Sequence, residues 1–179
     1  MVIALVGRRI DSPDARFAIF PLANVGRVRE DVRRLLGDRG ATAVVCSAAC
    51  GADLLALEAA GDAGLRRRIV LPFETGLFRE TSVVDRPGNW GPLFDKAIAE
   101  VQANGDLVEL QLPPDDDDSY LRANDRILTE ALSLAAAMNE KAAAVLVWNG
   151  VAREGKDITA AFGDAARARE LDVFEVRTL

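Results

Sequence analysis

One stretch of the chain combines small residues, a glycine and a carboxylate in the order Cys46-Ser47-Ala48-Ala49-Cys50-Gly51-Ala52-Asp53. Small side chains let a backbone approach a ligand closely, and the free amides at the start of a helix attract an anion. The stretch lacks the ending of a Walker motif and the spacing of the dinucleotide fingerprint, and it is also typical of a tight turn between strand and helix. We treat Ser47 and Gly51 as candidate ligand contacts. Asp53 would repel phosphate, so a ribose hydroxyl or a base N–H is its more suitable partner.

Two other segments carry residue types that suit phosphate binding. Gly7-Arg8-Arg9 directly follows an apolar run, and arginine pairs with phosphate through two N–H groups at once. Arg9 is more typical of a solvated surface than Arg8. The second segment offers glycines and the amides of a helix start, with Asn149, Gly150, Gly155, Lys156 and Thr159 as its candidate contacts. It is also typical of a plain helix start with Asp157 as the N-cap.

Asn124 lies on the apolar stripe of a predicted helix, between Tyr120 and Ile127. Its amide then faces inward, where a buried amide needs hydrogen-bond partners. We expect it either to tie down a backbone loop or to contact a ligand. Of the two tryptophans, Trp90 follows a loop turn and is the better candidate for stacking on a base. Trp148 ends a strand and is expected in the core.

The chain has no histidine, which excludes several classes of site at once. These are the Ser-His-Asp triad, the Cys-His pair and histidine-containing zinc sites. The aspartate run Asp115–Asp118 lacks the spacing of an EF-hand, and its position before a helix is typical of a solvated loop. We therefore predict neither a metal site nor a cofactor.

Composition indicates a globular, cytoplasmic chain. The 179 residues are 50% hydrophobic and 28% charged, and 22 Lys and Arg against 28 Asp and Glu give a net charge of −6. This balance has no broad electrostatic footprint, so we expect neither a nucleic acid polymer nor a membrane as partner. A local basic cluster could still bind one phosphorylated small molecule. The two cysteines, the start of the chain and the absence of a long apolar stretch favour a reduced, cytoplasmic setting.

Short β-branched runs alternate with amphipathic segments along the chain. The predicted strands are Val2–Val6, Thr42–Ser47, Arg68–Pro72, Leu107–Leu110, Ala143–Trp148 and Asp172–Val176. Several are continuous apolar runs, typical of parallel strands covered on both faces. Helical stripes lie between them, around residues 25–36, 54–59, 93–101, 120–135 and 158–165. The alternation predicts an α/β fold, namely a three-layer, Rossmann-like, doubly wound and mainly parallel sheet of about six strands.

Two long segments between these elements are predicted to be loops. They are Arg8–Leu22 and Phe73–Asn89, and each follows a strand. Loops after strands lie at the carboxyl edge of a parallel sheet, where open α/β sheets bind ligands. Because the chain shows no internal repeat and no shift in composition, residues 1–179 are predicted to form a single domain.

The order of these segments resembles the SMF/DprA–LOG superfamily, whose members are called SLOG domains. The matching residues are Gly7-Arg8, Gly51-Ala52-Asp53, Leu71-Pro72-Phe73, Phe78-Arg79-Glu80, Trp90, Asn124, Val147-Trp148-Asn149-Gly150 and the turn from Gly155 to Thr159. They cover nearly the whole chain. The resemblance implies a Rossmann-like fold that binds a nucleotide or nucleotide derivative at the strand ends, with Arg79 among the residues near it. Members often dimerise, so a homodimer is one assembly to consider.

Three roles compete within this superfamily. The chain fits the stand-alone, sensor-type proteins by its length, its charge and its intact loops. The phosphoribohydrolase branch, called lonely guy, cleaves a base from a nucleoside monophosphate and carries Pro-Gly-Gly-x-Gly-Thr-x-x-Glu with a catalytic glutamate. Aligning the threonine on Thr159 puts Phe162 at the glutamate, with Glu74 or Glu80 left as replacement acids. The DNA-processing branch binds single-stranded DNA, which the charge of −6 and the missing stacking platform disfavour.

We therefore predict a binding module in preference to an enzyme. Phosphate would be held by Arg8, Ser47, Gly51, Lys156 and Thr159. Asp53 and Asn124 would read the ribose or base. The enzymatic alternative is N-glycosidic hydrolysis of a nucleoside 5′-monophosphate with an altered motif, for which Glu80 is a weak candidate acid. A further alternative is an interaction scaffold whose loops dock a partner protein.

Overall fold

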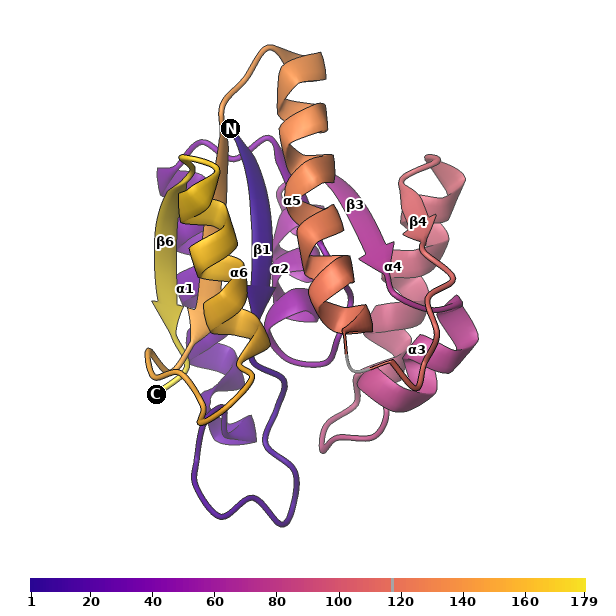
Figure 1. Cartoon of the computed structure of the whole chain (residues 1–179), viewed down its shortest axis with the longest axis vertical. Coiled ribbons are helices and arrows are strands. Elements are labelled where there is room, and N and C mark those ends of the chain that lie inside the picture. Colours follow the sequence, from indigo (N-terminus) through magenta and orange to yellow (C-terminus); the bar gives the residue numbers. More distant parts are fainter. Residues whose placement is uncertain (117) are drawn as a thin grey trace.

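Six parallel strands form one sheet in the order β4-β3-β2-β1-β5-β6. The computed structural model describes residues 1–116 and 118–179. The strands are β1 (Val2–Gly7), β2 (Ala43–Cys46), β3 (Arg66–Leu71), β4 (Leu107–Glu109), β5 (Ala142–Trp148) and β6 (Asp172–Arg177). Because every pairing is parallel, all the carboxyl ends lie at the same edge of the sheet (Figure 1). The parallel α/β sheet predicted from the sequence is confirmed.

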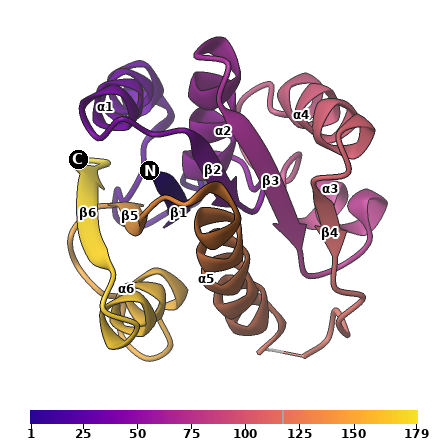
Figure 2. The same cartoon turned by 90° about the horizontal axis from the view of Figure 1, so that it is seen from above.

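Helices cover both faces of this sheet, as Figure 2 shows from above. On one face lie α1 (Val25–Asp38), α2 (Ala52–Asp62) and α4 (Gly91–Ala103), and on the other lie α5 (Ser119–Met138) and α6 (Ile158–Ala168). The 3-10 turn η1 (Leu22–Asn24) precedes α1, and α3 (Thr75–Ser82) follows β3. The three layers are those expected when apolar strands are buried on both sides.

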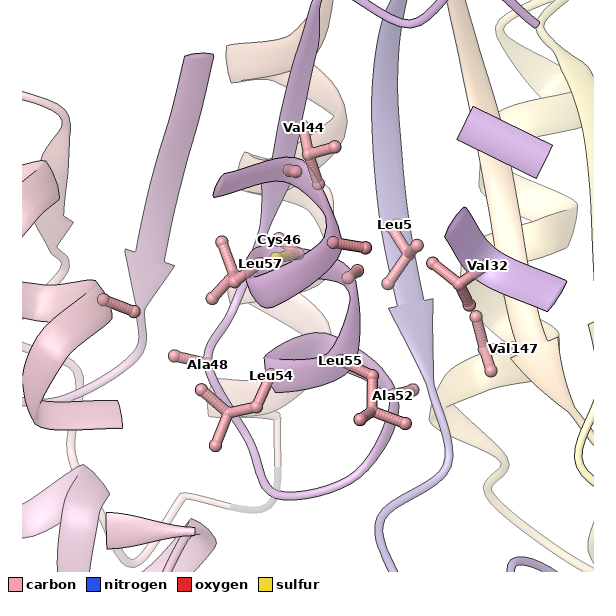
Figure 3. Packing of buried hydrophobic residues seen from close by; sticks show 14 of the residues in the cluster. Leu5, Val32, Val44, Cys46, Ala48, Ala52, Leu54, Leu55, Leu57 and Val147 are labelled. Carbon is pink, nitrogen blue, oxygen red and sulfur yellow. The ribbon is translucent and has the colours of Figure 1, made fainter. Parts of the chain in front are cut away.

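Side chains of β1 alternate between two hydrophobic cores. Ile3 and Leu5 belong to the core under α1 and α2, whereas Val2, Ala4 and Val6 belong to the core under α5 and α6. This alternation explains why the strand is apolar at every position, since successive residues of a strand point to opposite faces. Figure 3 shows the first core, in which leucines of α2 pack against side chains of β1 and β2.

The helix α3 corrects the prediction that Phe73–Asn89 is irregular throughout. Residues Thr75–Ser82 are helical, although the segment is too short to show a helical period and begins with a threonine and a glycine. Tertiary packing supplies what local sequence does not. Phe78 is 1% exposed, and its ring stacks on that of Phe94 in α4 at a centroid distance of 6.2 Å.

The order of the strands reverses next to β1. The chain runs outward from β1 through β2 and β3 to β4, and then returns to β5 on the other side of β1. The connections after β1 and β5 therefore leave the sheet edge in opposite directions and open a crevice, which is where doubly wound folds bind ligands. The loop after β1 projects below this edge in Figure 1.

Two predicted ligand glycines are required by the packing around this crevice. A Cβ atom on Gly7 would lie 2.4 Å from the Cβ atom of Ala52 and 2.5 Å from the carbonyl oxygen of Val147. Gly51 has a φ of +94°, and a Cβ atom there would lie 2.8 Å from the carbonyl oxygen of Arg8. Both glycines let the starts of neighbouring loops pack backbone against backbone.

Candidate functional site

A cavity of about 590 Å³ lies at the carboxyl edge of the sheet. The loop after β1 contributes most of residues 7–17 and Ile19. The turn after β2 contributes Ser47, Ala49 and Asp53, and the segment that leads into α6 contributes Arg153 and residues 156–159. The far wall comes from α3, α5 and the segment between α3 and α4. The cavity therefore lies at the position that the reversal of strand order predicts.

Arg8 is buried at the centre of this edge, and each of its N–H groups has a protein partner. Its Nη1 donates to Asp157 Oδ1 at 3.0 Å and its Nη2 to Asp157 Oδ2 at 2.7 Å. Nη1 also donates to Thr159 Oγ1 at 3.4 Å, Nη2 to the carbonyl oxygen of Val151 at 2.9 Å, and Nε to Asn149 Oδ1 at 3.3 Å. A guanidinium carries five N–H donors, so this set uses all of them.

The carboxylate of Asp157 occupies the start of α6. It accepts hydrogen bonds from the amides of Thr159 at 2.9 Å and Ala160 at 3.0 Å, which confirms it as the N-cap. Burial raises the pKa of Asp157, but hydrogen bonds from Arg8 and from the amides of Arg153 and Ala160 outweigh burial and lower it to about 2. The amides that formed the second candidate anion site therefore already bind the protein's own carboxylate.

Asp53 lies in the first turn of α2, is 6% exposed and lines the cavity. Its Oδ2 accepts a hydrogen bond from the amide of Ala49 at 3.2 Å, whereas its Oδ1 is buried without a hydrogen-bond partner among the described residues. Burial raises the pKa of Asp53 to about 7, against the opposing effects of the Ala49 amide and the positive charge of Arg9. Near neutral pH this carboxyl group is therefore divided between its protonated and ionised forms.

Two arginines present buried N–H groups to the same cavity. The Nε atoms of Arg9 and Arg86 are buried, and neither has a hydrogen-bond partner in the described part of the chain. Asp85 pairs with the Nη2 of Arg9, and its Oδ2 lies 3.5 Å from the Nε of Arg86. One carboxylate thus holds both guanidinium groups in place without satisfying either Nε.

Two further cations, Arg16 and Arg153, line the cavity and form no salt bridge with another described residue. Burial and the nearby positive charge of Arg8 lower the pKa of Arg153. Sequence reasoning selected Arg8 and set Arg9 aside, and it passed over Arg16, Arg86 and Arg153. The signal available was their place in segments that follow strands: Arg16 and Arg86 in the two long loops, and Arg153 between β5 and α6.

Some predicted residues line the cavity and others lie outside its described lining. Gly7, Arg8, Ser47, Asp53, Asn124, Lys156 and Thr159 are brought together there. Gly51, Asn149, Gly150, Gly155, Arg79, Glu80 and Trp90 are not among the residues of its wall. Arg79 pairs with Asp95 at 2.8 Å, Glu80 is exposed on α3, and the buried Trp90 donates from Nε1 to the carbonyl oxygen of Pro87 at 2.7 Å.

Three of the predicted polar residues in the wall also bind other parts of the protein. Ser47 Oγ donates to the carbonyl oxygen of Val70 at 2.8 Å, and Asn124 Nδ2 donates to that of Ile158 at 3.3 Å. Asn124 thus ties down the start of α6 while it faces the cavity. Lys156 pairs with Asp118 of the aspartate run, in which Asp117 lies outside the described residues.

Comparison with known proteins gives a likeness in fold. No family model matches the chain, and no curated protein matches it significantly. The chain is similar to the X-ray structure of DNA processing protein A (DprA) from Streptococcus pneumoniae, with 13% identity and a TM-score of 0.42. The match covers 96% of this chain and 57% of that one. The predicted resemblance to the SMF/DprA–LOG superfamily is thus confirmed in fold.

The prediction that excludes nucleic acid polymers as partners is wrong, since the matched structure is a DNA processing protein. The prediction relied on the net charge of −6, which is a sum over the whole chain and does not describe any one part of the surface. The described wall of the cavity instead carries six cationic side chains (Arg8, Arg9, Arg16, Arg86, Arg153, Lys156) and three carboxylates (Asp11, Asp53, Asp157). Across residues 1–116 and 118–179, no helix has the length and hydropathy needed to cross a membrane.

Replacing Arg8 with methionine leaves the Asp157 carboxylate buried without its counter-charge. We expect Arg8→Met to lower the free energy of unfolding by about 3–5 kcal/mol, measured by urea denaturation. Arg33→Met, which removes an exposed arginine of α1, is the matched control and should leave stability unchanged. The double variant Arg8→Met/Asp157→Asn should recover part of the loss. Equal stability of Arg8→Met and the control would contradict the assigned role.

The pH dependence of the free energy of unfolding tests the raised pKa of Asp53. Its pKa rises from 3.8 to about 7 on folding, so the folded chain binds more protons than the unfolded chain between these values. Ionisation of Asp53 therefore lowers stability as pH rises through this range. Asp53→Asn removes this effect. Relative to the wild type, its stability should rise as the pH increases from about 4 to about 7 and then level off, with a total gain of at most about 4 kcal/mol.

Urea unfolding at a series of pH values measures this difference. Asp172→Asn, at the exposed start of β6, is the matched control. A difference between Asp53→Asn and the wild type that stays constant across the pH series would contradict the buried, ionisable carboxyl group.

Proposed function

We propose that the chain binds a phosphorylated, nucleotide-type small molecule in the cavity at the carboxyl edge of its sheet. The observation that carries this proposal is the set of buried polar atoms that lack protein partners. Arg9 Nε, Arg86 Nε and Asp53 Oδ1 all belong to residues of one cavity wall. A buried polar group without a partner costs about 1–3 kcal/mol, so three such groups in residues of one wall favour a functional role for that wall.

The charge of the wall favours an anionic group on that ligand. Arg8 and Asp157 neutralise each other, and Lys156 pairs with Asp118. Arg9 and Arg86 share the single carboxylate of Asp85, and Arg16 and Arg153 add two more positive charges. Arginine binds phosphate through planar, paired N–H groups, which makes a phosphoryl group a suitable partner for this set.

The position of Asp53 favours a hydrogen-bond donor on the same ligand. When ionised, its Oδ1 can accept a hydrogen bond from a ribose hydroxyl or from an N–H group of a base. Ser47 and Asn124 lie in the same wall and can add polar contacts. A cavity of about 590 Å³ is of the size that small-molecule ligands occupy. A ligand that carries both a phosphoryl group and a ribose or base matches these features.

This proposal redistributes the roles expected from the sequence. Arg8 and Thr159 are engaged with Asp157, so we assign phosphate binding to Arg9, Arg86 and Arg153. Asp53 keeps the role of reading ribose or base. Phosphate is thus assigned to arginine side chains and not to the amides of the two helix starts.

Binding should depend on the cavity arginines. Arg86→Met and Arg9→Met should each weaken binding of the tightest nucleoside 5′-monophosphate roughly 10- to 100-fold, because each removes a charged hydrogen-bond donor. Isothermal titration at millimolar ligand measures this, and Arg33→Met on α1 is the control. The proposal would be overturned if none of the four common nucleoside monophosphates binds. It would also be overturned if the chain binds a single-stranded oligonucleotide but no monophosphate.

One observation favours N-glycosidic cleavage as a second candidate function. Phe162, at the position of the glutamate in the phosphoribohydrolase motif, is buried in the core under α6, and Glu80 lies outside the described cavity wall. Asp53 lines the cavity with a pKa of about 7, which suits a general acid near neutral pH. Chromatography after overnight incubation separates the two functions. Binding alone leaves the monophosphate intact, whereas cleavage releases free base and Asp53→Asn abolishes that release.

A further inference from the structure

Three aromatic rings line the cavity, and two of them are already packed. Phe78 is buried and stacks on Phe94. Tyr120 meets Phe73 edge to face at a centroid distance of 5.5 Å, and its hydroxyl group lies 3.0 Å from Ser82 Oγ. Phe78 is 1% exposed and Tyr120 is only partly exposed, so neither ring offers a ligand a large exposed surface.

The third ring, Phe17, is largely exposed to solvent. It is 81% exposed, the most exposed of the large hydrophobic side chains in the described part of the chain, and it still belongs to the cavity wall. No stacking partner for it exists among the described residues. Trp90, the ring expected from the sequence to stack on a base, donates to Pro87. Trp148, which was expected in the core, is engaged with Arg8 and Glu175.

The loop that carries Phe17 is anchored at its base. The carboxylate of Asp11 accepts hydrogen bonds from the amides of Ile19 and Phe20, both at 3.0 Å, and the amide of Asp11 donates to the carbonyl oxygen of Phe20 at 3.0 Å. Thr178 Oγ1 donates to the carbonyl oxygen of Ile19 at 2.5 Å, which ties the loop to the end of β6. These bonds fix where the loop leaves and rejoins the fold.

The tip beyond these anchors consists of exposed residues, from 13 to 18. Arg16 and Phe17 are neighbours in this tip, and both line the cavity. The anchored ends of the loop thus hold a cation and an aromatic ring next to each other in the cavity wall. The tip can adjust to a ligand while its anchors keep it in register with the cavity.

We propose that Phe17 stacks on the planar base of the bound ligand and so makes the cavity specific for ligands that carry a base. The inference rests on the proposed function, because it requires a phosphorylated ligand in the cavity. Stacking removes an exposed ring and a base face from water together, and aromatic–base contacts need no particular hydrogen-bond pattern. Arg16 lies next to this contact and adds positive charge at the same end of the cavity.

A comparison of ligands with and without a base tests this role. The probes are the 5′-monophosphates of adenosine, guanosine, cytidine and uridine, with ribose 5-phosphate as the ligand that lacks a base. Phe17→Ala should weaken the tightest monophosphate roughly 10- to 100-fold and change ribose 5-phosphate less than about 2-fold. Phe17→Trp should retain monophosphate affinity, and the fluorescence of the added indole should be quenched by the base.

The control variant is Leu132→Ala, which removes an exposed hydrophobic side chain from α5. It should leave all affinities unchanged, and circular dichroism checks that each variant folds. As a second measurement, trypsin cleavage after Arg16 should be slowed by the monophosphate and not by ribose 5-phosphate.

The outcomes separate this inference from the proposed function. If the wild type binds neither monophosphates nor ribose 5-phosphate, both fail. If the wild type binds monophosphates and Phe17→Ala binds them equally well, only the role of Phe17 fails. The same holds if Phe17→Ala weakens both kinds of ligand equally. A wild-type dimer that Phe17→Ala converts to a monomer, with unchanged affinity, would instead assign the ring to contact with a second copy.

Discussion

The paired contact between Arg8 and Asp157 links two parts of the fold that are far apart in the sequence, the end of β1 and the connection from β5 to α6. Arg8 follows the central strand β1, Asp157 caps α6, and Asn149 and Val151 follow β5. A buried ion pair contributes little net stability, because desolvation of the two charges offsets their attraction. Its geometry is nonetheless demanding, since a bidentate pair fixes both distance and orientation. The contact therefore sets how the connections after β1 and β5 face each other, and the crevice between them depends on it.

The electrostatics of the cavity depend on this pairing. Because Arg8 and Asp157 neutralise each other, the remaining positive charge comes from side chains on the two long loops and from Arg153, which lies between β5 and α6. Asp85 holds Arg9 and Arg86 together without satisfying their Nε atoms. In the same wall, burial keeps Asp53 only partly ionised near neutral pH, which limits its repulsion of an anion. The wall thus combines cationic side chains with a carboxyl group suited to a hydrogen-bond donor.

Much of the fold could be predicted, and the part that could not has a physical explanation. Continuous apolar runs marked β1, β2 and β5, because strands buried on both faces need hydrophobic residues at every position. Local sequence already offered helix capping by Asp157 as one interpretation of its segment, because an N-cap side chain bonds amides only two and three positions further on. The helix α3 was missed because Phe78 is held by Phe94, sixteen residues away, and not by a periodic pattern of its own.

The sequence by itself determined the succession of strands and helices and the two loops that border the cavity, because these follow from contacts between near neighbours in the chain. Only the tertiary structure decided which polar groups remain available. Arg8 and Arg9 are adjacent, yet the partner of Arg8 lies 149 residues away and that of Arg9 lies 76 residues away. Together with Asn149, Val151 and Thr159, the first partner satisfies every donor of the Arg8 guanidinium. The second leaves the Nε of Arg9 without a partner among the described residues. Whether a side chain is free to bind a ligand depends on such distant contacts, and no local pattern encodes them.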